Sequence, residues 1–190
     1  MNVKIKRLHP DAVIPQYATS GAAAFDLVAV EDVIIAPGET ALVPLGFAIE
    51  LPIGLEMQIR PRSGVTAKTK LRVGNAPGTV DSDFRGEVKV IVDNTAQQEH
   101  SYGYTVNTLN GWEVQTEYRH DYNTYIIRSG DRIAQGVIAP VLRVNLIETD
   151  EELSETERGA GGFGHTGVTT EEAIEGLREA SETWREAMVN

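Results

Sequence analysis

The stretch that decides the fold is Leu55-Glu56-Met57-Gln58-Ile59-Arg60, in which apolar and polar side chains alternate strictly. Successive side chains of a β-strand point to opposite faces, so this period of two predicts a half-buried strand. Similar patterns recur in residues 3–6, 47–51 and 88–92. Glycine and proline turn signals stand at residues 36–38, 51–54 and 129–131. Short strands separated by such turn residues predict an all-β fold, an antiparallel barrel or jelly roll.

Residues 94–128 look like an addition to this barrel. Asn110-Gly111 is the sequence typical of a type I′ hairpin turn. From Trp112 to Tyr118, apolar or β-branched residues alternate with polar ones, so we predict a hairpin over about residues 102–118. Its aromatic side chains either pack inward, as is usual in hairpins, or form a platform for a protein partner. We expect the inward arrangement.

The C-terminal part predicts two further elements. Residues 150–169 are polar and glycine-rich, which is typical of a mobile arm. Thr169 and Glu172 have the spacing of a capping box, and an apolar stripe at helical spacing follows. We therefore divide the chain into a barrel domain (1–149), an arm (150–169) and an acidic amphipathic helix (170–190). Such a stripe usually docks onto its own protein, and a partner protein is the alternative.

The 190-residue chain has 28 acidic and 17 basic residues, a net charge of -11. Residues 148–190 hold 12 of the acidic residues and three of the basic ones, so the barrel part is nearly neutral. The acidic balance argues against binding nucleic acid, whose phosphates need a basic face. The absence of cysteine excludes disulfides, zinc thiolates and cysteine nucleophiles. Without a signal sequence or a long apolar run, the chain is expected to be cytoplasmic, in the host cytoplasm if phage-encoded.

Three local patterns suggest chemistry. Arg62-Ser63-Gly64 combines a guanidinium, a hydroxyl and an accessible backbone N–H, which suits a phosphate oxygen. Asp81 and Asp83 can act as a general base or face Mg²⁺, although the local sequence alone favours an Asx-type turn between strands. The glycine-rich residues 158–167 can approach a polyphosphate closely, but composition alone favours a flexible linker.

Taken together, five segments resemble the five motifs of the trimeric dUTP pyrophosphatases (dUTPases), in the same order. They are residues 21–27 (GAAAFDL), 61–64 (PRSG), 74–86 (GNAPGTVDSDFRG), 130–135 (GDRIAQ) and 158–167 (RGAGGFGHTG). The resemblance implies a distorted jelly roll that forms a homotrimer with shared active sites. In that arrangement the C-terminal arm of one subunit closes over a site built mainly by the others. It also implies Mg²⁺-dependent hydrolysis of dUTP to dUMP and pyrophosphate.

The resemblance assigns the catalytic roles residue by residue. Asp81 matches the aspartate that orients the attacking water toward the α-phosphorus, and Arg158 matches the arginine that clamps the phosphates. Asp26 matches the aspartate that reaches the hydrated Mg²⁺ ion. An in-line attack depends on a fixed water and a carboxylate that accepts its proton.

The substrate contacts follow from the same motifs. The phosphate contacts match Arg62, Ser63, Gly64 and Gln135. Asn75 and the backbone of Thr79 and Val80 match the wall that reads uracil, where cytosine would leave buried groups unpaired. Phe84 matches the ring under the deoxyribose, and Lys89 adjoins the substrate.

The arm supplies the remaining contacts. Phe163 matches the ring that covers uracil, and Gly164, His165 and Thr166 match the contacts to the γ-phosphate. Two positions depart from the family: Phe84 replaces the common Tyr, and His165 replaces the common Ser. His165 is either a phosphate donor that titrates near neutral pH or an exposed residue whose backbone alone matters.

Other functions remain open to test. A related deaminase acting on dCTP shares this fold, but the segment from Asn75 to Asp81 favours the hydrolase. A regulatory binding protein, acting through the 94–128 region or the tail helix, can coexist with the enzyme. An inert jelly-roll coat module is a third alternative, which fails if Asp81→Asn abolishes turnover without disturbing the fold. Similar insertions occur in some phage dUTPases, so the 94–128 region hints at a phage source.

Overall fold

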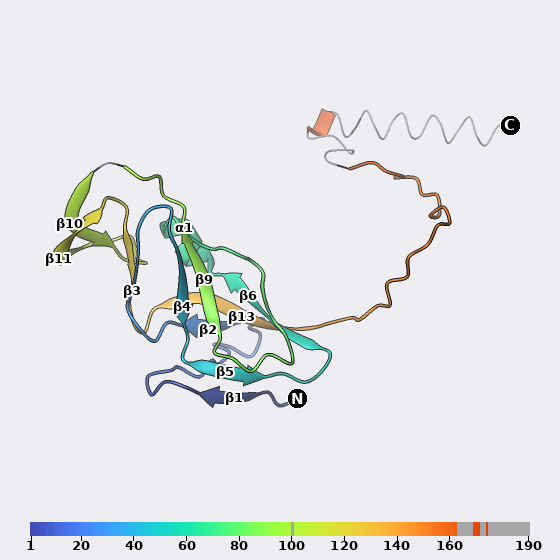
Figure 1. Ribbon diagram of the computed structural model, residues 1–190, viewed down its shortest axis with the longest axis horizontal. Coiled ribbons are helices and arrows are strands. Elements are labelled where there is room, and N and C mark those ends of the chain that lie inside the picture. The colour runs from blue at the N-terminus through green and yellow to red at the C-terminus, as the bar shows by residue number, and fades with distance from the viewer. Residues whose placement is uncertain (100, 163–168, 172–173, 175–190) are drawn as a thin grey trace. The chain divides into compact units, whose positions relative to one another are not determined.

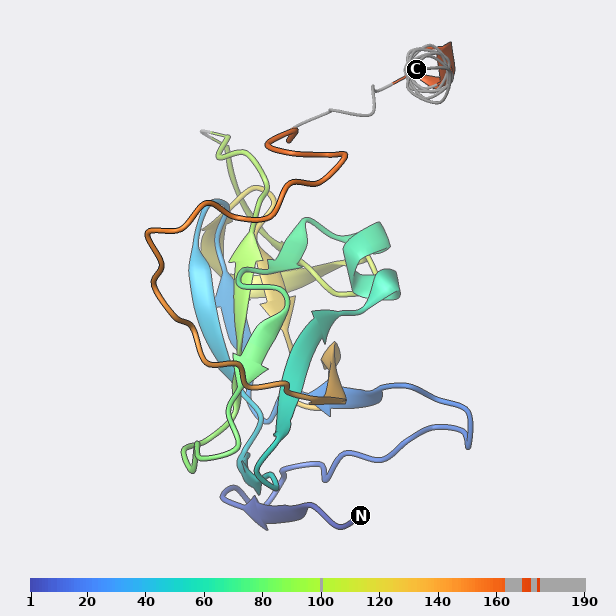
Figure 2. The same cartoon turned by 90° about the vertical axis from the view of Figure 1, so that its right-hand side faces the viewer.

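The computed structural model describes residues 1–99, 101–162, 169–171 and 174. Nearly all of its regular structure is β-strand (Figure 1). The strands are β1 (Lys4–Arg7), β2 (Phe25–Val28), β3 (Val33–Ile35), β4 (Thr40–Pro44), β5 (Phe47–Glu50), β6 (Leu55–Pro61), β7 (Leu71–Val73), β8 (Gly78–Val80), β9 (Lys89–Asn94), β10 (Tyr102–Asn107), β11 (Glu113–Asp121), β12 (Tyr125–Ile127) and β13 (Arg132–Pro140). One short helix, α1 (Ser63–Lys68), follows β6 directly (Figure 2).

The strand that the alternating stretch predicts is β6, and it lies inside the sheet β2-β13-β6-β8. Met57 and Ile59 are buried, whereas Arg60 is exposed, as the alternation requires. A second sheet, β4-β9-β7, contributes Val43, Val90 and Val92 to the same core. The predicted all-β jelly roll is confirmed.

The edge pair β1 and β5 joins Lys4 to Glu50 across the two strands. The Lys4 ammonium donates a 2.8 Å hydrogen bond to the Glu50 carboxylate. This hydrogen bond and the positive charge of Lys4 lower the pKa of Glu50. Because both side chains are exposed, this ion pair contributes little to the free energy of unfolding. It shows which residues of β1 and β5 face each other.

The predicted hairpin is formed by β10 and β11 and is longer than expected, since β11 continues to Asp121. Its turn differs from the predicted type I′ turn. Gly111 has φ +79°, but Asn110 does not adopt the positive φ that type I′ requires. Instead the N–H of Gly111 donates to Thr108 O (2.9 Å), and the N–H of Thr108 donates to Trp112 O (2.8 Å). These bonds define a three-residue loop that ends in a left-handed glycine.

The prediction that the hairpin buries its own aromatic side chains is wrong. Trp112 is 73% exposed and Tyr118 is 72% exposed, and Tyr102, Tyr104 and Tyr122 are also exposed. The reason lies in the topology. β10 meets β12 only at the Asn107–Tyr125 pair, so most of the hairpin is a two-stranded ribbon with no second layer to cover it. Only Val106, close to that pair, is buried.

The chain divides into two compact units, Met1–Val144 and Asn145–Asn190. In the second unit, residues 156–161 form turns, and Thr170, Glu171 and Ile174 are helical. The rest of the predicted helix at 170–190 lies outside the described residues. The proposed division at residues 149 and 169 stays a prediction. Among the described residues, no helix has the length and apolar character needed to cross a membrane.

Candidate active site

One pocket gathers six of the predicted site residues. This motif-three pocket has a volume of about 290 Å³ and is lined by Leu42, Ile59, Asn75, Gly78, Thr79, Val80, Asp81, Phe84, Glu87, Val88, Lys89 and Ile91. The short strand β8 supports it by pairing with β6, with Gly78 opposite Ile59 and Val80 opposite Met57. β8 is the last strand of this sheet, so the peptide groups on its outer edge are not used by a neighbouring described strand.

Two glycines set the position of side chains in this pocket. A Cβ atom on Gly78 would lie 3.1 Å from Asn75 Nδ2. A Cβ atom on Gly86 would lie 2.6 Å from Phe84 Cζ, a separation at which the ring must move. The absence of a side chain at Gly78 and Gly86 therefore lets Asn75 and Phe84 lie close against the backbone. The ring of Phe84 remains 43% exposed.

Asp81 follows β8 directly and is exposed. The turn after it is closed by the backbone N–H of Phe84, which donates to Asp81 O (3.2 Å). In the described part of the chain, the Asp81 carboxylate accepts no hydrogen bond, so the Asx-turn interpretation of this residue is not supported. Asp81 also borders an adjoining hollow of about 590 Å³ that Ser82 and Asp83 share. Its carboxylate is therefore open to a solvent molecule.

A second group of predicted residues meets on the neighbouring strands β2, β13 and β6. Asp26 Oδ1 lies 2.8 Å from Arg62 Nε, and Asp26 Oδ2 lies 3.3 Å from Arg132 Nη1. Arg62 also donates to Arg132 O (2.9 Å), and Gln135 Nε2 donates to Pro61 O (3.0 Å). The side chains of Asp26 and Arg62 are each 31% exposed, so their ion pair is partly shielded from water.

Beside this group lies the α1 cleft, a hollow of about 440 Å³. It is lined by Arg62, Gly64, Val65, Lys68, Leu109, Asn110, Gly130, Asp131 and Arg132. Three of these side chains are cationic and one is acidic. Asp26 pairs with two of the cations, so the group keeps a small excess of positive charge, which favours an anionic ligand. Ser63, which the sequence predicts as a phosphate contact, begins α1, with Arg62 as its extended N-cap residue.

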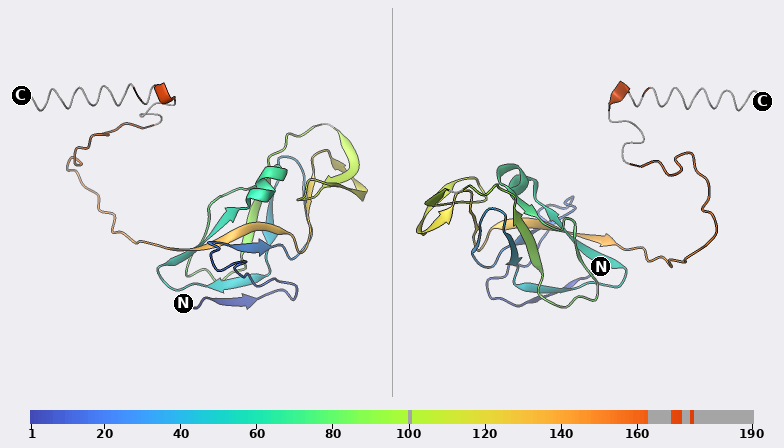
Figure 3. Two further views of the ribbon diagram at one scale, coloured as in Figure 1. Left: turned by 180° about the vertical axis from the view of Figure 1, so that it is seen from behind. Right: turned by 45° about the horizontal axis from the view of Figure 1, so that its top comes forward.

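Several cleft residues were not among the predicted site residues. Arg132 lies within the quoted segment 130–135, and its neighbour Gln135 alone was selected there. The local sequence around Lys68 and Asn110 does not indicate a ligand site, because a lysine at a helix end and an asparagine in a turn are common features. Leu109 lies in a polar turn and becomes informative only once the hairpin is seen beside α1 (Figure 3).

Within one chain the predicted residues therefore form two groups. The motif-three pocket and the α1 cleft have no lining residue in common. Arg158 belongs to the second unit, where its Nε donates to Gly161 O (2.8 Å). Phe163, Gly164, His165 and Thr166 lie outside the described residues.

The described residues contain no group of three or more His, Cys, Asp or Glu side chains placed to hold a metal ion. Both oxygens of Asp26 are already paired with arginines. A cage of protein ligands is thus not present in this part of the chain. A Mg²⁺ ion at this site would therefore keep several waters and be held chiefly by the phosphates of a bound nucleotide.

An antiparallel barrel with an open carboxylate, an amide-bearing pocket and a cationic cleft has the features of a nucleotide-binding hydrolase. Comparison with known proteins makes this specific. The dUTPase family profile matches residues 11–102 and 118–167. The chain therefore belongs to the dUTPase family, as its motifs predict. Residues 103–117, between the two matched segments, form most of the β10–β11 hairpin. This unmatched stretch is shorter than the predicted 94–128 insertion.

Sequence relatives cover most of the chain. A deoxyuridine 5'-triphosphate nucleotidohydrolase of Nautilia profundicola is 47% identical over 167 residues, which is 88% of this chain and 99% of that protein. The corresponding protein of Helicobacter pylori strain J99 is 41% identical over 169 residues, with 89% and 99% covered.

Solved structures of phage enzymes share the fold. The Staphylococcus bacteriophage 80alpha dUTPase with dUpNHpp has a TM-score of 0.82 at 28% identity, covering 88% of this chain and 99% of the other. A dUTPase from phage phi11 of S. aureus, in which a species-specific insert is visualised, has a TM-score of 0.76 at 26% identity, with 82% and 100% covered.

Proposed function

We propose that this chain hydrolyses dUTP to dUMP and pyrophosphate, using a water molecule that Asp81 orients toward the α-phosphorus. The observation that carries the proposal is the motif-three pocket of a dUTPase-family chain. Asn75, Thr79, Val80, Asp81, Phe84 and Lys89 line this one pocket. The sequence relatives named above are nucleotidohydrolases of deoxyuridine 5'-triphosphate, which supports the same substrate.

Recognition of uracil rests on the edge of β8. The backbone of Thr79 and Val80 on this edge strand, with the amide of Asn75, can pair with the N3–H donor and O4 acceptor of uracil. Cytosine presents the opposite pattern and would leave these groups unpaired, at a cost of about 1–3 kcal/mol for each buried group. The exposed ring of Phe84 lies under the deoxyribose and leaves no room for a 2′-hydroxyl.

The phosphates are held by Arg62, Ser63, Gly64 and Gln135, with Lys89 beside the substrate. Arg158 and the arm residues Phe163, Gly164, His165 and Thr166 complete the contacts from the C-terminal arm. The cations that line the α1 cleft support this assignment, because they can balance charge that develops on the phosphates.

In the reaction, Asp81 accepts a proton from the attacking water as the water oxygen bonds to the α-phosphorus. The bond to the bridging oxygen of the β-phosphate breaks, and pyrophosphate leaves. Mg²⁺, when bound to the triphosphate, reduces the negative charge that repels the water. Asp26 would contact this ion through a water molecule of its hydration shell, because both carboxylate oxygens already face arginines and direct coordination would displace them.

A homotrimer with shared active sites is part of the proposal. The two groups of site residues line separate hollows in one chain, which supports a site completed by a second chain. In the cell, the reaction limits uracil in DNA and supplies dUMP for thymidylate synthesis. We place it in the cytoplasm, or in the host cytoplasm if the chain is phage-encoded.

A second function is favoured by the hairpin. Its exposed Trp112 and Tyr118 provide the aromatic surface that protein interfaces use. The phage 80alpha dUTPase is described as controlling transfer of virulence genes by a G protein-like mechanism. A protein partner at the hairpin is therefore the second function that we propose.

The test is turnover of dUTP, dCTP, dTTP and UTP, with and without Mg²⁺, monitoring pyrophosphate and ammonia. We expect pyrophosphate from dUTP alone, in the presence of Mg²⁺, and no ammonia from dCTP. Asp81→Asn should lower kcat by about 10²–10⁴-fold, the usual contribution of a general base.

Asp83→Asn is the matched control, because it makes the same change two residues away in the same turn. It should keep most of the activity. An equal loss in both variants would support a two-carboxylate metal site instead, and ammonia release from dCTP would contradict the hydrolase assignment.

A further inference from the structure

We infer that Leu109, at the tip of the β10–β11 hairpin, is a positioning residue that holds α1, and with it Ser63 and Gly64, in place for the phosphates of the substrate. The inference rests on the proposed function, because Ser63 and Gly64 matter only if they contact a triphosphate. It assigns to the hairpin a role inside its own chain, separate from any partner.

The first step is that α1 cannot hold its own shape. It has six residues, none of them buried, and its N-cap residue Arg62 makes no side-chain capping hydrogen bond. Helices this short are unstable in water without packing against other elements. The position of Ser63 and Gly64 therefore depends on what the inner side of α1 touches.

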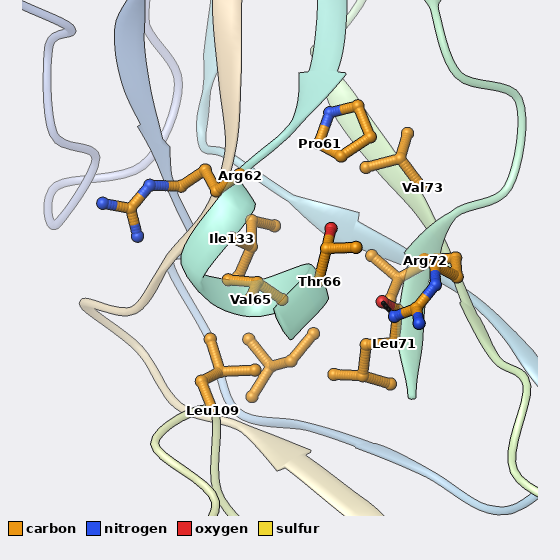
Figure 4. A pocket seen from close by; sticks show the side chains of 11 residues that line it. Pro61, Arg62, Val65, Thr66, Leu71, Arg72, Val73, Leu109 and Ile133 are labelled. Carbon is orange, nitrogen blue, oxygen red and sulfur yellow. Dashed lines mark hydrogen bonds between the residues drawn. The ribbon is translucent and has the colours of Figure 1, made fainter. Parts of the chain in front are cut away.

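The second step is that Leu109 forms part of that contact. Val65 and Thr66 of α1 line a small cavity together with Leu109, Ile127 and Ile133 (Figure 4). The cavity measures only about 10 Å³, barely the space that one water molecule requires, so these side chains are closely packed. Val65 and Leu109 both pack against the buried core of the barrel.

The third step is that the loop carrying Leu109 is well fixed. Its ends are tied by the two backbone hydrogen bonds described above. The Thr108 hydroxyl adds a further bond by donating to Trp112 O (3.0 Å). These hydrogen bonds therefore hold the backbone at Leu109 in one position relative to α1.

The end of β10 next to this loop is anchored as well. The N–H of Asn107 donates to Thr124 O (2.8 Å), next to the strand β12. The Tyr125 hydroxyl then accepts a hydrogen bond from the N–H of Lys70 (3.2 Å), two residues after α1 ends. The hairpin and the strand it joins therefore support α1 at its middle and just beyond its C-terminal end.

The support comes from outside the shared family framework. Leu109 lies within residues 103–117, which the family profile does not match. Asn110, the next residue, lines the α1 cleft beside Arg62, Lys68 and Arg132. The hairpin thus contributes to the cationic cleft two residues that lie outside the matched family segments.

The experiment compares Leu109→Ala with the full-length parent by binding of dUMP and of the triphosphate analogue dUpNHpp, and by steady-state kinetics. Binding of dUMP should stay within about twofold, because the motif-three pocket has no hairpin residue in its lining. Affinity for dUpNHpp and kcat/KM for dUTP should fall about tenfold, as expected when a phosphate contact is displaced by a fraction of an ångström.

Three further variants keep the result interpretable. Gln115→Ala, an exposed position on the same hairpin, should behave as the parent. Leu109→Met should restore most of the lost affinity, because it keeps the volume. If Leu109→Ala does not fold, Leu109→Val should show the same selective loss at smaller size.

The outcomes separate the two claims. A parent that turns over dUTP, with Leu109 variants that bind both ligands like the parent, would overturn the inference alone. An equal loss of dUMP and dUpNHpp affinity would also overturn it, since that result indicates a general structural role. A parent that neither binds dUpNHpp nor turns over dUTP would instead reject the proposed function.

Discussion

The motif-three pocket takes its predicted substrate contacts from one stretch, residues 75–89, whereas the α1 cleft is lined by three distant segments, residues 62–68, 109–110 and 130–132. In the pocket, glycines and an edge strand place the side chains of Asn75 and Phe84 locally. In the cleft, a short helix takes its position from a hairpin that follows it by some forty residues. On the proposed assignment, base recognition is thus built into a local motif, whereas phosphate binding depends on packing between distant segments.

Arg62→Ala should have the largest effect on the cleft. It removes both the ion pair with Asp26 and the bond to Arg132 O, and it leaves Asp26 with Arg132 alone. We expect kcat/KM for dUTP to fall by about 10²–10³-fold, as when a transition-state contact is lost. Binding of dUMP, measured by calorimetry, should change little.

If dUMP binding fell as much as turnover, the pocket and the cleft would not be separable. Arg60→Ala is the control, because Arg60 is exposed and lies on β6, two residues before Arg62. Among the described residues, its side chain bonds only to Gln58. It should leave both measurements near the parent values.

Gly86→Ala should have a smaller effect, and on the pocket. Its Cβ atom would meet the Phe84 ring at 2.6 Å, so the ring must shift from the place assigned to the deoxyribose. We expect dUMP and dUpNHpp affinities to fall together by about tenfold, a cost of about 1.4 kcal/mol typical of an overpacked site. Gly103→Ala, whose Cβ atom would meet nothing nearer than 3.8 Å, should be neutral. Loss of triphosphate affinity alone would contradict this assignment.

Trp112→Ala should have the smallest effect. The side chain is 73% exposed and lines neither the pocket nor the cleft. Turnover should match the parent, and the free energy of unfolding should change by about 0.5 kcal/mol or less, as for most surface substitutions. A fall in dUTP turnover beyond twofold would show that the exposed aromatic face, and not only Leu109, supports the site.

The same contrast explains how much the sequence could predict. The jelly roll follows from the alternation around Met57 and Ile59, because a period of two allows only one face to be buried. The predicted contacts of the motif-three pocket follow from one stretch of the chain, residues 75–89, since a turn and its flanking strands bring them together. Leu42 and Ile59 complete the lining from other strands.

The remaining features depend on packing between distant segments. The turn at Asn110 closes as a three-residue loop, because the register of β10 and β11 places Thr108 opposite Trp112. Residues such as Lys68 and Leu109 gain their role only from the placement of α1 beside that loop. No local sequence pattern predicts such a contact.

The measurement that tests the account most directly is complementation between two inactive chains. Asp81→Asn disables the motif-three pocket and Arg62→Ala disables the α1 cleft. The account predicts that co-expressed, randomly mixed trimers regain about a quarter of the parental dUTP turnover, because one site in four then draws an intact pocket and an intact cleft from different chains. Turnover no higher than that of the two variants assayed separately would contradict it, since both halves of the site would then have to come from the same chain.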